Sequence, residues 1–340
     1  MKVLITGGAG FIGSVLTPLL IDKGHTVRVV DRGFFGLDHV DNRAQVIDGD
    51  ILDFNPDWLD PMDAVIHLAG LSNDPMAAFS PRLNYMFNAA GAAIVAQATK
   101  SAGISRFVLG STCSVYGTDD EELVDEERPT NPPYPYAISK LMAERAIGCL
   151  SDRQFRPIIL RKGTVVGWSP RMRFDLVTNS MVKTAITERR IVVHNPRLWR
   201  PLIDVEDAAR AYLAAVEADL AVTGIFNIST RNYNLRELAE TVADALVDFD
   251  IRIRLEVQAQ QGLRSYRVLT DKAKAVLHFE SVKPMRTTVR EVMVNLVTGS
   301  VVHLDDPRYY NVKQMELLMA QGLLDDGRPR PLESAIAVSA

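Results

Sequence analysis

The first 31 residues constrain the fold of this chain more strongly than any other stretch, because two apolar runs flank a glycine-rich turn and a helical pattern. Short apolar runs rich in β-branched residues are typical of buried strands, and an apolar spacing of about 3.6 residues indicates a helix. A strand, a tight turn, a helix and a second strand are therefore predicted. They are the strand Lys2 to Thr6, the turn with Gly7, Gly8, Gly10 and Gly13, the helix Phe11 to Leu20 and the strand Thr26 to Val30, which is followed by Asp31.

The glycines of this turn have a spacing that suits a bound dinucleotide. Gly8, Gly10 and Gly13 satisfy the pattern G-x-G-x-x-G, and Gly7, Gly10 and Gly13 satisfy G-x-x-G-x-x-G. One glycine permits the tight turn, one lets a pyrophosphate approach the backbone, and one lets the helix pack closely against the strand. The pyrophosphate would lie on the unpaired amides of the helix N-terminus, where the helix dipole favours negative charge.

Asp31, at the end of the second strand, indicates that the dinucleotide is NAD. A carboxylate at this place can accept hydrogen bonds from both ribose hydroxyls of the adenosine, and it would repel the 2′-phosphate of NADP. Arg32 follows directly, and a neighbouring arginine can accommodate such a phosphate. The sequence therefore favours NAD and leaves NADP open.

Beyond this segment, apolar runs alternate with helical patterns as far as about Gly167. Such runs suit parallel strands covered on both faces, and the alternation indicates right-handed β-α-β units. After Gly167 the pattern changes to short strands, arginine-bearing loops and isolated helices. The sequence predicts strands at Gln45 to Ile47, Asp63 to Leu68, Arg106 to Gly110 and Pro157 to Leu160, helices at Pro81 to Ala102, Tyr136 to Leu150, Asp175 to Thr187, Val205 to Glu217 and Asn311 to Leu324, and a loop from Asp119 to Pro135.

These patterns predict an α/β fold, namely a Rossmann-type doubly wound parallel sheet with a smaller C-terminal substrate-binding lobe over the carboxyl ends of the strands. We expect residues 1–166, with parts of 200–230, to form the NAD-binding domain and residues 167–300 to form the lobe. Residues 301–340 would add a C-terminal helix and a polar tail.

The composition excludes several classes of protein. Hydrophobic residues make up 47% of the chain and charged residues 24%, which is ordinary for a globular enzyme, and the net charge of −4 gives no reason to expect nucleic acid or a membrane surface as a partner. The chain shows no apolar run of the ~18 residues that a spanning helix requires and no signal-peptide pattern. Cys113 and Cys149 form neither a disulfide framework nor a metal-ligand spacing. We therefore expect a cytoplasmic enzyme without a metal site.

One constellation has the chemistry of an acid/base catalyst. Tyr136 and Lys140 stand four residues apart, so both project from the same face of the predicted helix. A nearby ammonium stabilises phenolate and lowers the pKa of tyrosine from its reference of about 10, which makes a usable base near neutral pH. Thr112 follows the preceding strand, where its hydroxyl could hold the reacting oxygen. His67 and His194 are lone histidines beside strands, and we interpret them as structural.

Together these motifs resemble the extended short-chain dehydrogenase/reductases, specifically the nucleotide-sugar epimerase/dehydratase group, over Met1 to about Ala275. The resemblance implies that Thr112, Tyr136 and Lys140 form a catalytic triad and that Lys140 also holds the nicotinamide ribose. It implies an NAD cofactor, a nucleotide-diphosphate sugar as substrate, and a homodimer formed by pairing the helices Pro81 to Ala102 and Tyr136 to Leu150. The motifs are TGGAGFIGS, Asp31, Gly49-Asp50-Ile51, His67-Leu68-Ala69-Gly70, Asn88, STCSVYG from Ser111 to Gly117, YPYAISK, and RPLIDVED from Arg200 to Asp207.

The resemblance also implies which residues line the site. Thr164 stands where the family commonly has asparagine, and Arg200 matches an arginine that commonly grips the substrate diphosphate through its planar fork. Arg171, Arg173, Arg264 and Arg267 are further arginines in loops of the expected lobe. For the cofactor the implied residues are Gly7, Gly10, Phe11, Ile12, Gly13, Asp31, Arg32, Asp50, Ile51, Leu68, Ala69, Gly70, Asn88, Tyr136 and Lys140. For the substrate they are Ser72, Thr112, Cys113, Ser114, Thr164, Arg173, Arg200 and Arg264.

Departures from the family pattern narrow the reaction. Members that eliminate water across C5 and C6 carry an acidic pair where this chain has Cys113 and Ser114, and these two residues are no natural acid/base pair at neutral pH. C4 epimerisation needs only the tyrosine, the threonine and a retained NAD, so we expect a C4 epimerase that acts through a transient 4-keto sugar. The alternatives are a 4-ketoreductase or dehydrogenase with an exchangeable cofactor, a 4,6-dehydratase, and a dinucleotide sensor without catalysis.

Overall fold

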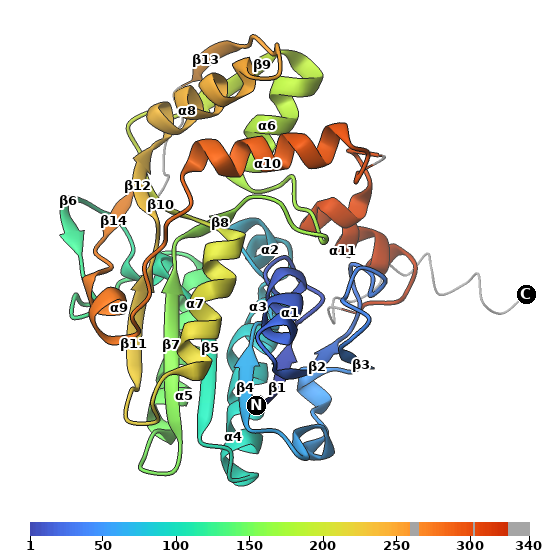
Figure 1. Cartoon of the computed structure of the whole chain (residues 1–340), viewed down its shortest axis with the longest axis vertical. Helices are drawn as coiled ribbons and strands as arrows, with labels where there is room; N and C mark the ends of the chain where they lie inside the picture. The colour runs from blue at the N-terminus through green and yellow to red at the C-terminus, as the bar shows by residue number, and fades with distance from the viewer. Residues whose placement is uncertain (259–264, 302, 326–340) are drawn as a thin grey trace, which may run out of the picture.

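The structure is a computed structural model that describes residues 1–258, 265–301 and 303–325 (Figure 1). Within these ranges the largest sheet has seven parallel strands in the order β11-β7-β5-β4-β1-β2-β3. The order reverses at β1, and ligands of open α/β sheets bind beside such a reversal. The strands are β1 (Lys2–Thr6), β2 (Thr26–Asp31), β3 (Gln45–Asp48), β4 (Ala64–His67), β5 (Arg106–Thr112), β7 (Arg156–Lys162) and β11 (Gly224–Ile228).

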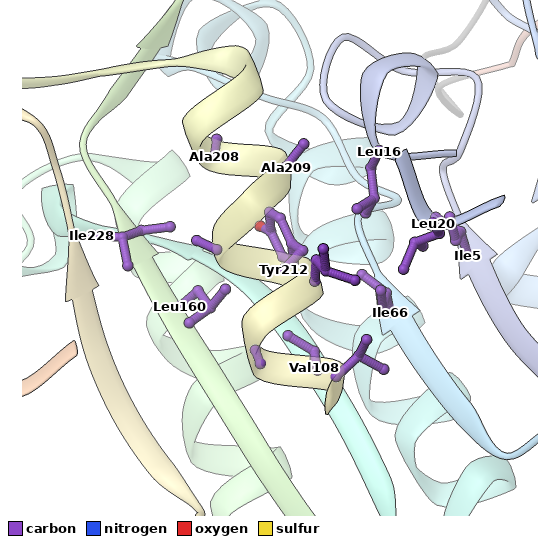
Figure 2. Packing of buried hydrophobic residues seen from close by; sticks show 14 of the residues in the cluster. Ile5, Leu16, Leu20, Ile66, Val108, Leu160, Ala208, Ala209, Tyr212 and Ile228 are labelled. Carbon is purple, nitrogen blue, oxygen red and sulfur yellow. The ribbon is translucent and has the colours of Figure 1, made fainter. Parts of the chain in front are cut away.

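Helices cover both faces of this sheet. On one face α1 and α7 contact each other, and Figure 2 shows Tyr212 of α7 among apolar side chains of the strands. On the other face α4 and α5 bury a second apolar cluster that includes Leu4 and Leu109. The central strands are buried on both sides, which explains their unbroken apolar runs. The helices are α1 (Gly13–Asp22), α7 (Val205–Glu217), α3 (Pro81–Tyr85), the π-helical turn η3 (Met86–Gly91), α4 (Ala92–Ser101) and α5 (Pro135–Leu150).

A smaller lobe lies beyond the carboxyl ends of the strands, at the top of Figure 1. Its helices bury an apolar cluster of their own, which includes Val182, Leu238 and Val289. The three helices of this cluster are α6 (Val177–Glu188), α8 (Leu235–Val247) and α10 (Met285–Val297). The lobe also holds β8 (Thr164–Val166), β10 (Trp199–Asp204) and β12 (Arg231–Asn234) in one sheet, and β9 (Arg190–His194) with β13 (Arg254–Gln258) in another.

The last helix of the described chain, α11 (Asn311–Ala320), returns to the strand-bearing part of the molecule. Met315 is fully buried in the same cluster as Leu4 and Leu109, and the Gln314 side-chain amide donates to the Phe34 carbonyl at 2.8 Å. This bond joins α11 to the loop that follows β2, and Figure 1 shows α11 above β2. The remaining helices are α2 (Asp74–Phe79) and α9 (Asp271–Val276), with short 3-10 turns at 51–53, 56–59, 113–116 and 307–309.

The predicted α/β class and the Rossmann-type sheet are confirmed, whereas several local predictions are wrong. The segment Asp119 to Pro135, expected as a loop, contains β6 (Asp119–Val124), which pairs in parallel with β14 (Tyr266–Val268). The sequence of β6 is acidic and lacks the alternation of apolar and polar residues that predicts a strand. Only its pairing with the distant β14 identifies it as a strand. The helix expected over Pro81 to Ala102 is interrupted by η3, whose Asn88 bonds to the distant residues Leu71 and Ser139, and local periodicity does not reveal such a π-helical turn.

Four predicted helices differ only at their ends. Helix α1 spans Gly13–Asp22 rather than Phe11 to Leu20, and α5 begins at Pro135 rather than Tyr136. Helix α6 spans Val177–Glu188 rather than Asp175 to Thr187, and α11 ends at Ala320 rather than Leu324. The division into domains stays a prediction, and the polar tail from residue 326 lies outside the described residues. No helix in the described ranges is long and apolar enough to cross a membrane.

Candidate functional site

Two cavities lie side by side at the carboxyl ends of the parallel strands. The larger one has a volume of about 240 Å³ and the smaller one about 110 Å³. They are adjacent because six residues line both, namely Gly7, Gly10, Phe35, Leu68, Gly70 and Leu71. The two cavities therefore form one elongated site beside the strand-order reversal at β1.

The glycine turn forms the floor between these cavities. Gly7 has φ +74°, a conformation that side chains rarely adopt. A Cβ atom on Gly13 would lie 2.5 Å from the Cα of Gly8, so glycine is needed for α1 to approach the turn. The predicted cofactor residues Gly7, Gly10, Phe11, Ile12 and Gly13 all line the larger cavity.

The smaller cavity has the acidic end expected for an adenosine. The Asp31 carboxylate accepts hydrogen bonds from the backbone amides of Ala9, at 3.0 Å, and Gly33, at 2.9 Å, while burial raises its pKa. Arg32 is paired with Asp50 at 2.7 Å. This arginine is therefore already engaged by a carboxylate, which argues against a 2′-phosphate partner. Asp31, Arg32, Asp50 and Ile51 all line the smaller cavity.

The segment after β4 forms the wall opposite the glycine turn. Gly70 has φ +147°, and a Cβ atom there would lie 2.3 Å from the Asn88 side-chain oxygen. Asn88 donates to the Leu71 carbonyl at 2.9 Å, so η3 holds this segment in place. Leu68 and Gly70 line both cavities, Asn88 lines the larger one and Ala69 the smaller one.

The three predicted catalytic residues come together in the larger cavity. Thr112, Tyr136 and Lys140 all line it, together with the glycine turn. The Thr112 hydroxyl donates to the Ser114 Oγ at 3.1 Å. Lys140 is buried, and this burial lowers the pKa of its ammonium to about 8. The ammonium is therefore mostly charged at neutral pH, as the stabilisation of a tyrosine phenolate requires.

A buried ion pair holds the elements that carry this triad. The Arg161 guanidinium of β7 binds the Glu144 carboxylate of α5 through two nitrogens, with the shortest contact at 2.6 Å. The hydroxyl of Ser111, the residue before Thr112, donates to the same carboxylate. Glu144 thus connects α5, β5 and β7 one helical turn after Lys140.

Cys113 does not take the predicted substrate-binding position. Its side chain is fully buried in an apolar cluster, and its thiol donates to the Arg161 carbonyl at 3.0 Å. Burial raises the pKa of this thiol above its usual range. Thr112 and Ser114 line the cavity and Cys113 does not, because the chain turns into a 3-10 helix directly after β5.

The other predicted substrate residues divide into three groups. Ser72, Thr164 and Arg173 line the larger cavity, and the Arg173 guanidinium donates to the Ser72 hydroxyl at 2.8 Å. Arg200 does not line either cavity, and its guanidinium lies 5.9 Å from the ring of Tyr266. Arg264 lies outside the described residues.

Sequence reasoning missed several residues of the cavity wall, among them Phe35, Lys162 and Asn311. Phe35 and Asn311 come from a loop and from the start of α11. Lys162, at the end of β7, donates to the Ser111 carbonyl at 2.7 Å, and burial together with the charge of Lys140 lowers its pKa to about 7. A lysine two residues after a predicted buried strand was a usable signal, whereas nothing in the local sequence marks Phe35 or Asn311.

His67 lies in the interior and lines neither cavity, as a structural histidine would. It is fully buried, its Nδ1 lies 2.7 Å from the Thr6 hydroxyl, and burial lowers its pKa to about 3. In the part of the chain that the structure describes, no group of three or more His, Cys, Asp or Glu side chains could hold a metal ion. The donor set of the two cavities, with glycine amides, an acidic end and a lysine-tyrosine pair, fits NAD.

Comparison with known proteins agrees with this geometry. The model of the NAD dependent epimerase/dehydratase family matches residues 3–229. A UDP-glucose 4-epimerase of Lactobacillus helveticus is 35% identical over 338 residues, which are 92% of this chain and 100% of the relative. A UDP-glucose 4-epimerase of Corynebacterium glutamicum is 32% identical over 150 residues, 43% of this chain and 46% of the relative. The chain thus spans about half the length of the Corynebacterium relative and of a similar one from Azospirillum brasilense.

Solved structures share the fold. The UDP-glucose 4-epimerase of Thermus thermophilus, solved in complex with NAD, has a TM-score of 0.77 at 23% identity and covers 88% of this chain and 100% of its own. At this identity the similarity shows the fold. The family model matches about two thirds of this chain, and the Lactobacillus helveticus relative aligns over its whole length. This chain therefore belongs to the NAD-dependent epimerase/dehydratase family.

Proposed function

We propose that this protein is an NAD-dependent epimerase that inverts C4 of a nucleotide-diphosphate hexose. One observation carries the proposal, namely that Thr112, Tyr136 and Lys140 line the same cavity as the glycine turn. An acid/base group and a hydride acceptor are then within reach of one sugar carbon. The full-length relative from Lactobacillus helveticus is a UDP-glucose 4-epimerase, which supports UDP-glucose as the first substrate to test.

In this proposal Tyr136 removes the proton of the C4 hydroxyl and later returns one to the 4-keto oxygen. Lys140 stabilises the phenolate through its positive charge, and the Thr112 hydroxyl orients the reacting oxygen by a hydrogen bond. The glycine turn and Lys140 would hold NAD, which would supply the acceptor and donor of the C4 hydride, and inversion would require the 4-keto sugar to turn within the cavity. The residues after β4 and the lobe residue Arg173 exclude water from the sugar and hold it in place.

The surroundings of Cys113 and Ser114 argue against dehydration. A dehydratase needs an acid and a base at these two positions, whereas the Cys113 thiol is turned away and its pKa is raised. The Ser114 hydroxyl is within 3.2 Å of the Tyr266 hydroxyl and has no charged partner among its described contacts. This pair supplies neither role, so C4 inversion fits the cavity better.

A reductase is the second candidate, because a GDP-6-deoxy-D-mannose reductase of Pseudomonas aeruginosa is 30% identical over 262 residues. The first experiment therefore separates NAD, NADH, NADP and NADPH from freshly purified, denatured protein. Near-stoichiometric NAD that survives dialysis supports an internal hydride cycle. An empty site or bound NADPH would contradict the epimerase and favour the reductase.

The Tyr136→Phe variant tests the catalytic role. We expect interconversion of UDP-glucose and UDP-galactose to slow by at least about a hundredfold, as is typical when a positioned acid/base is lost. NAD content should stay at the wild-type level, because the phenol oxygen is not needed to hold the cofactor. If turnover is unchanged, Tyr136 is not the base. A protein that binds NAD equally well but turns over no nucleotide sugar, even as wild type, would be a sensor instead.

We also propose a cytoplasmic homodimer formed through α4, α5 and the segment η3. In support, the partly exposed apolar side chains of Met86, Ile94 and Met142 lie on these elements. Cys113 and Cys149 are both free, which is typical of a reducing compartment. Light scattering of the wild type and of an Ile94→Asp variant tests the dimer, since a monomeric wild type would contradict it.

A further inference from the structure

Arg171 is a buried cation in the wall of the larger cavity. The residue is only 4% exposed, and its guanidinium lies 3.8 Å from the ring centre of Phe35. One nitrogen, Nη2, donates to the Asn311 side-chain oxygen at 2.6 Å. Two others, Nε and Nη1, have no hydrogen-bond partner among the described residues. Buried donors without partners are costly, so this arrangement calls for an acceptor.

The charge of Arg171 leads to the same conclusion. Burial and the neighbouring Arg173 lower the pKa of its guanidinium to about 9. Arg173 is already paired with Asp175 at 2.8 Å, whereas the ion pairs of the described residues include none for Arg171. Among the described residues that line the larger cavity there is no aspartate or glutamate, whereas Lys140, Lys162, Arg171 and Arg173 all line it. An anion in the cavity would therefore relieve the unfavourable burial of this charge.

The position of Arg171 identifies which anion this is. Phe35, the ring on which the guanidinium stacks, lines both cavities and so marks the border between them. Asp31 stands at the adenosine end of the smaller cavity, and Tyr136 and Lys140 stand in the larger one. A dinucleotide that spans both cavities must carry its diphosphate across this border. The substrate diphosphate has no such constraint.

We propose that Arg171 is a second binding group for the cofactor diphosphate, supplied by the lobe, and that α11 positions it through Asn311. This inference rests on the proposed function, since it assumes a dinucleotide in the two cavities. The glycine turn would bind the diphosphate with backbone amides from one side, and the guanidinium would bind it from the other. An arginine fork suits paired phosphate oxygens. The cofactor is then enclosed between the sheet and the lobe.

Binding of ADP-ribose, NAD and UDP to the cofactor-free protein tests this inference by calorimetry. Arg171→Met removes the charge and keeps much of the volume. We expect it to weaken ADP-ribose and NAD by at least about tenfold, as for the loss of hydrogen bonds to a charged group. UDP, which reports on the substrate diphosphate, should change by less than about twofold. Arg171→Lys should give an intermediate loss, because it keeps the charge without the fork.

Thermal unfolding gives a second readout that does not depend on activity. Without ligand, Arg171→Met should melt at or above the wild-type temperature, because a costly buried charge is gone. Its stabilisation by NAD should be smaller than that of the wild type. Asn311→Ala should also reduce NAD binding, by a smaller factor. The matched control is Arg210→Met, which removes another arginine stacked near an aromatic ring, Phe279, but outside both cavities.

The possible outcomes are distinct. Unchanged NAD and ADP-ribose affinity in both Arg171 variants overturns the inference while leaving the proposed function intact. A loss confined to UDP overturns it as well, because Arg171 would then serve the substrate diphosphate. A wild-type protein that binds neither NAD nor ADP-ribose refutes the proposed function itself. If Arg171→Met does not fold, the affinities of Arg171→Lys and Asn311→Ala for NAD, ADP-ribose and UDP are compared with those of the wild type instead.

Discussion

At the scale of single residues, two lysines share one wall of the cavity. The folded structure lowers the pKa of Lys140 to about 8 and that of Lys162 to about 7, and in both cases burial is the main cause. In the unfolded chain a lysine has a pKa of about 10.4. Between roughly pH 7 and pH 10 the unfolded chain therefore binds protons that the folded, cofactor-free protein does not bind.

This difference predicts how stability depends on pH. Because the unfolded state binds more protons in that window, the free energy of unfolding should rise as the pH increases from about 7 toward 10. Lys162→Met should flatten the rise by on the order of 1–3 kcal/mol, since one pKa unit corresponds to about 1.4 kcal/mol. Urea unfolding of cofactor-free protein at pH 6.5, 8 and 9.5, roughly spanning this window, makes the measurement. Parallel curves for the wild type and the variant would show that Lys162 does not titrate in this window.

At the scale of elements, the ion pair of Glu144 and Arg161 joins α5 to β7 and to the end of β5. Both side chains are almost fully buried, so removing one charge leaves the other without compensation. Glu144 lies on α5, the helix that carries Tyr136 and Lys140, so loss of the ion pair should also disturb the position of these two residues. Stability and turnover should therefore be affected together.

Glu144→Gln is expected to lower the free energy of unfolding by about 3–5 kcal/mol, as for other broken buried pairs. Urea unfolding gives the value, and turnover of the folded fraction shows whether the triad is displaced. The matched control is Asp152→Asn, which breaks the pair of Asp152 with Lys100, 2.7 Å apart and far more exposed than Glu144 and Arg161. That change should cost at most about 1 kcal/mol. Equal losses in the two variants would contradict the structural role given to Glu144.

At the scale of the whole molecule, α11 closes the cavity wall by packing on the strand-bearing part of the chain. Met315 of this helix is fully buried, whereas Leu317, two residues on, is 40% exposed. Asn311, at the start of the same helix, lines the cavity. Packing at Met315 is therefore connected to the position of Asn311 and to the binding of the cofactor.

Met315→Ala should cost about 2–5 kcal/mol of stability, the usual range for a large buried side chain. The purified variant should also retain less NAD, because the wall near Asn311 loosens. Leu317→Ala is the control and should stay within about 0.5 kcal/mol of the wild type with unchanged NAD. A Met315→Ala protein that is less stable but keeps all of its NAD would separate the packing of α11 from the cofactor site.

Much of the sheet and the chemistry of the site could be predicted from sequence, because local patterns determine them. Apolar runs indicated the strands that are buried on both faces, and the glycine turn and the Tyr136–Lys140 pair can each be recognised within a few consecutive residues. Cys113 was predicted to bind substrate but lies buried away from the cavity, because the turn after β5 is not visible in the sequence. Phe35, Asn311 and β6 depend on contacts between distant segments, which no local periodicity reveals.

Strand β11 is separated from its neighbour β7 by about sixty residues that build part of the lobe. A ribosome makes a protein from its N-terminus, so the nascent sheet keeps an open edge until residues 224–228 have emerged. The cavity stays open longer still, until Asn311 has been synthesised and α11 has docked. The glycine turn and Tyr136 are thus translated before much of the site. Asn311, which accepts a hydrogen bond from Arg171, is translated last among the site residues. We therefore expect the chain to bind the dinucleotide tightly only after α11 has been translated.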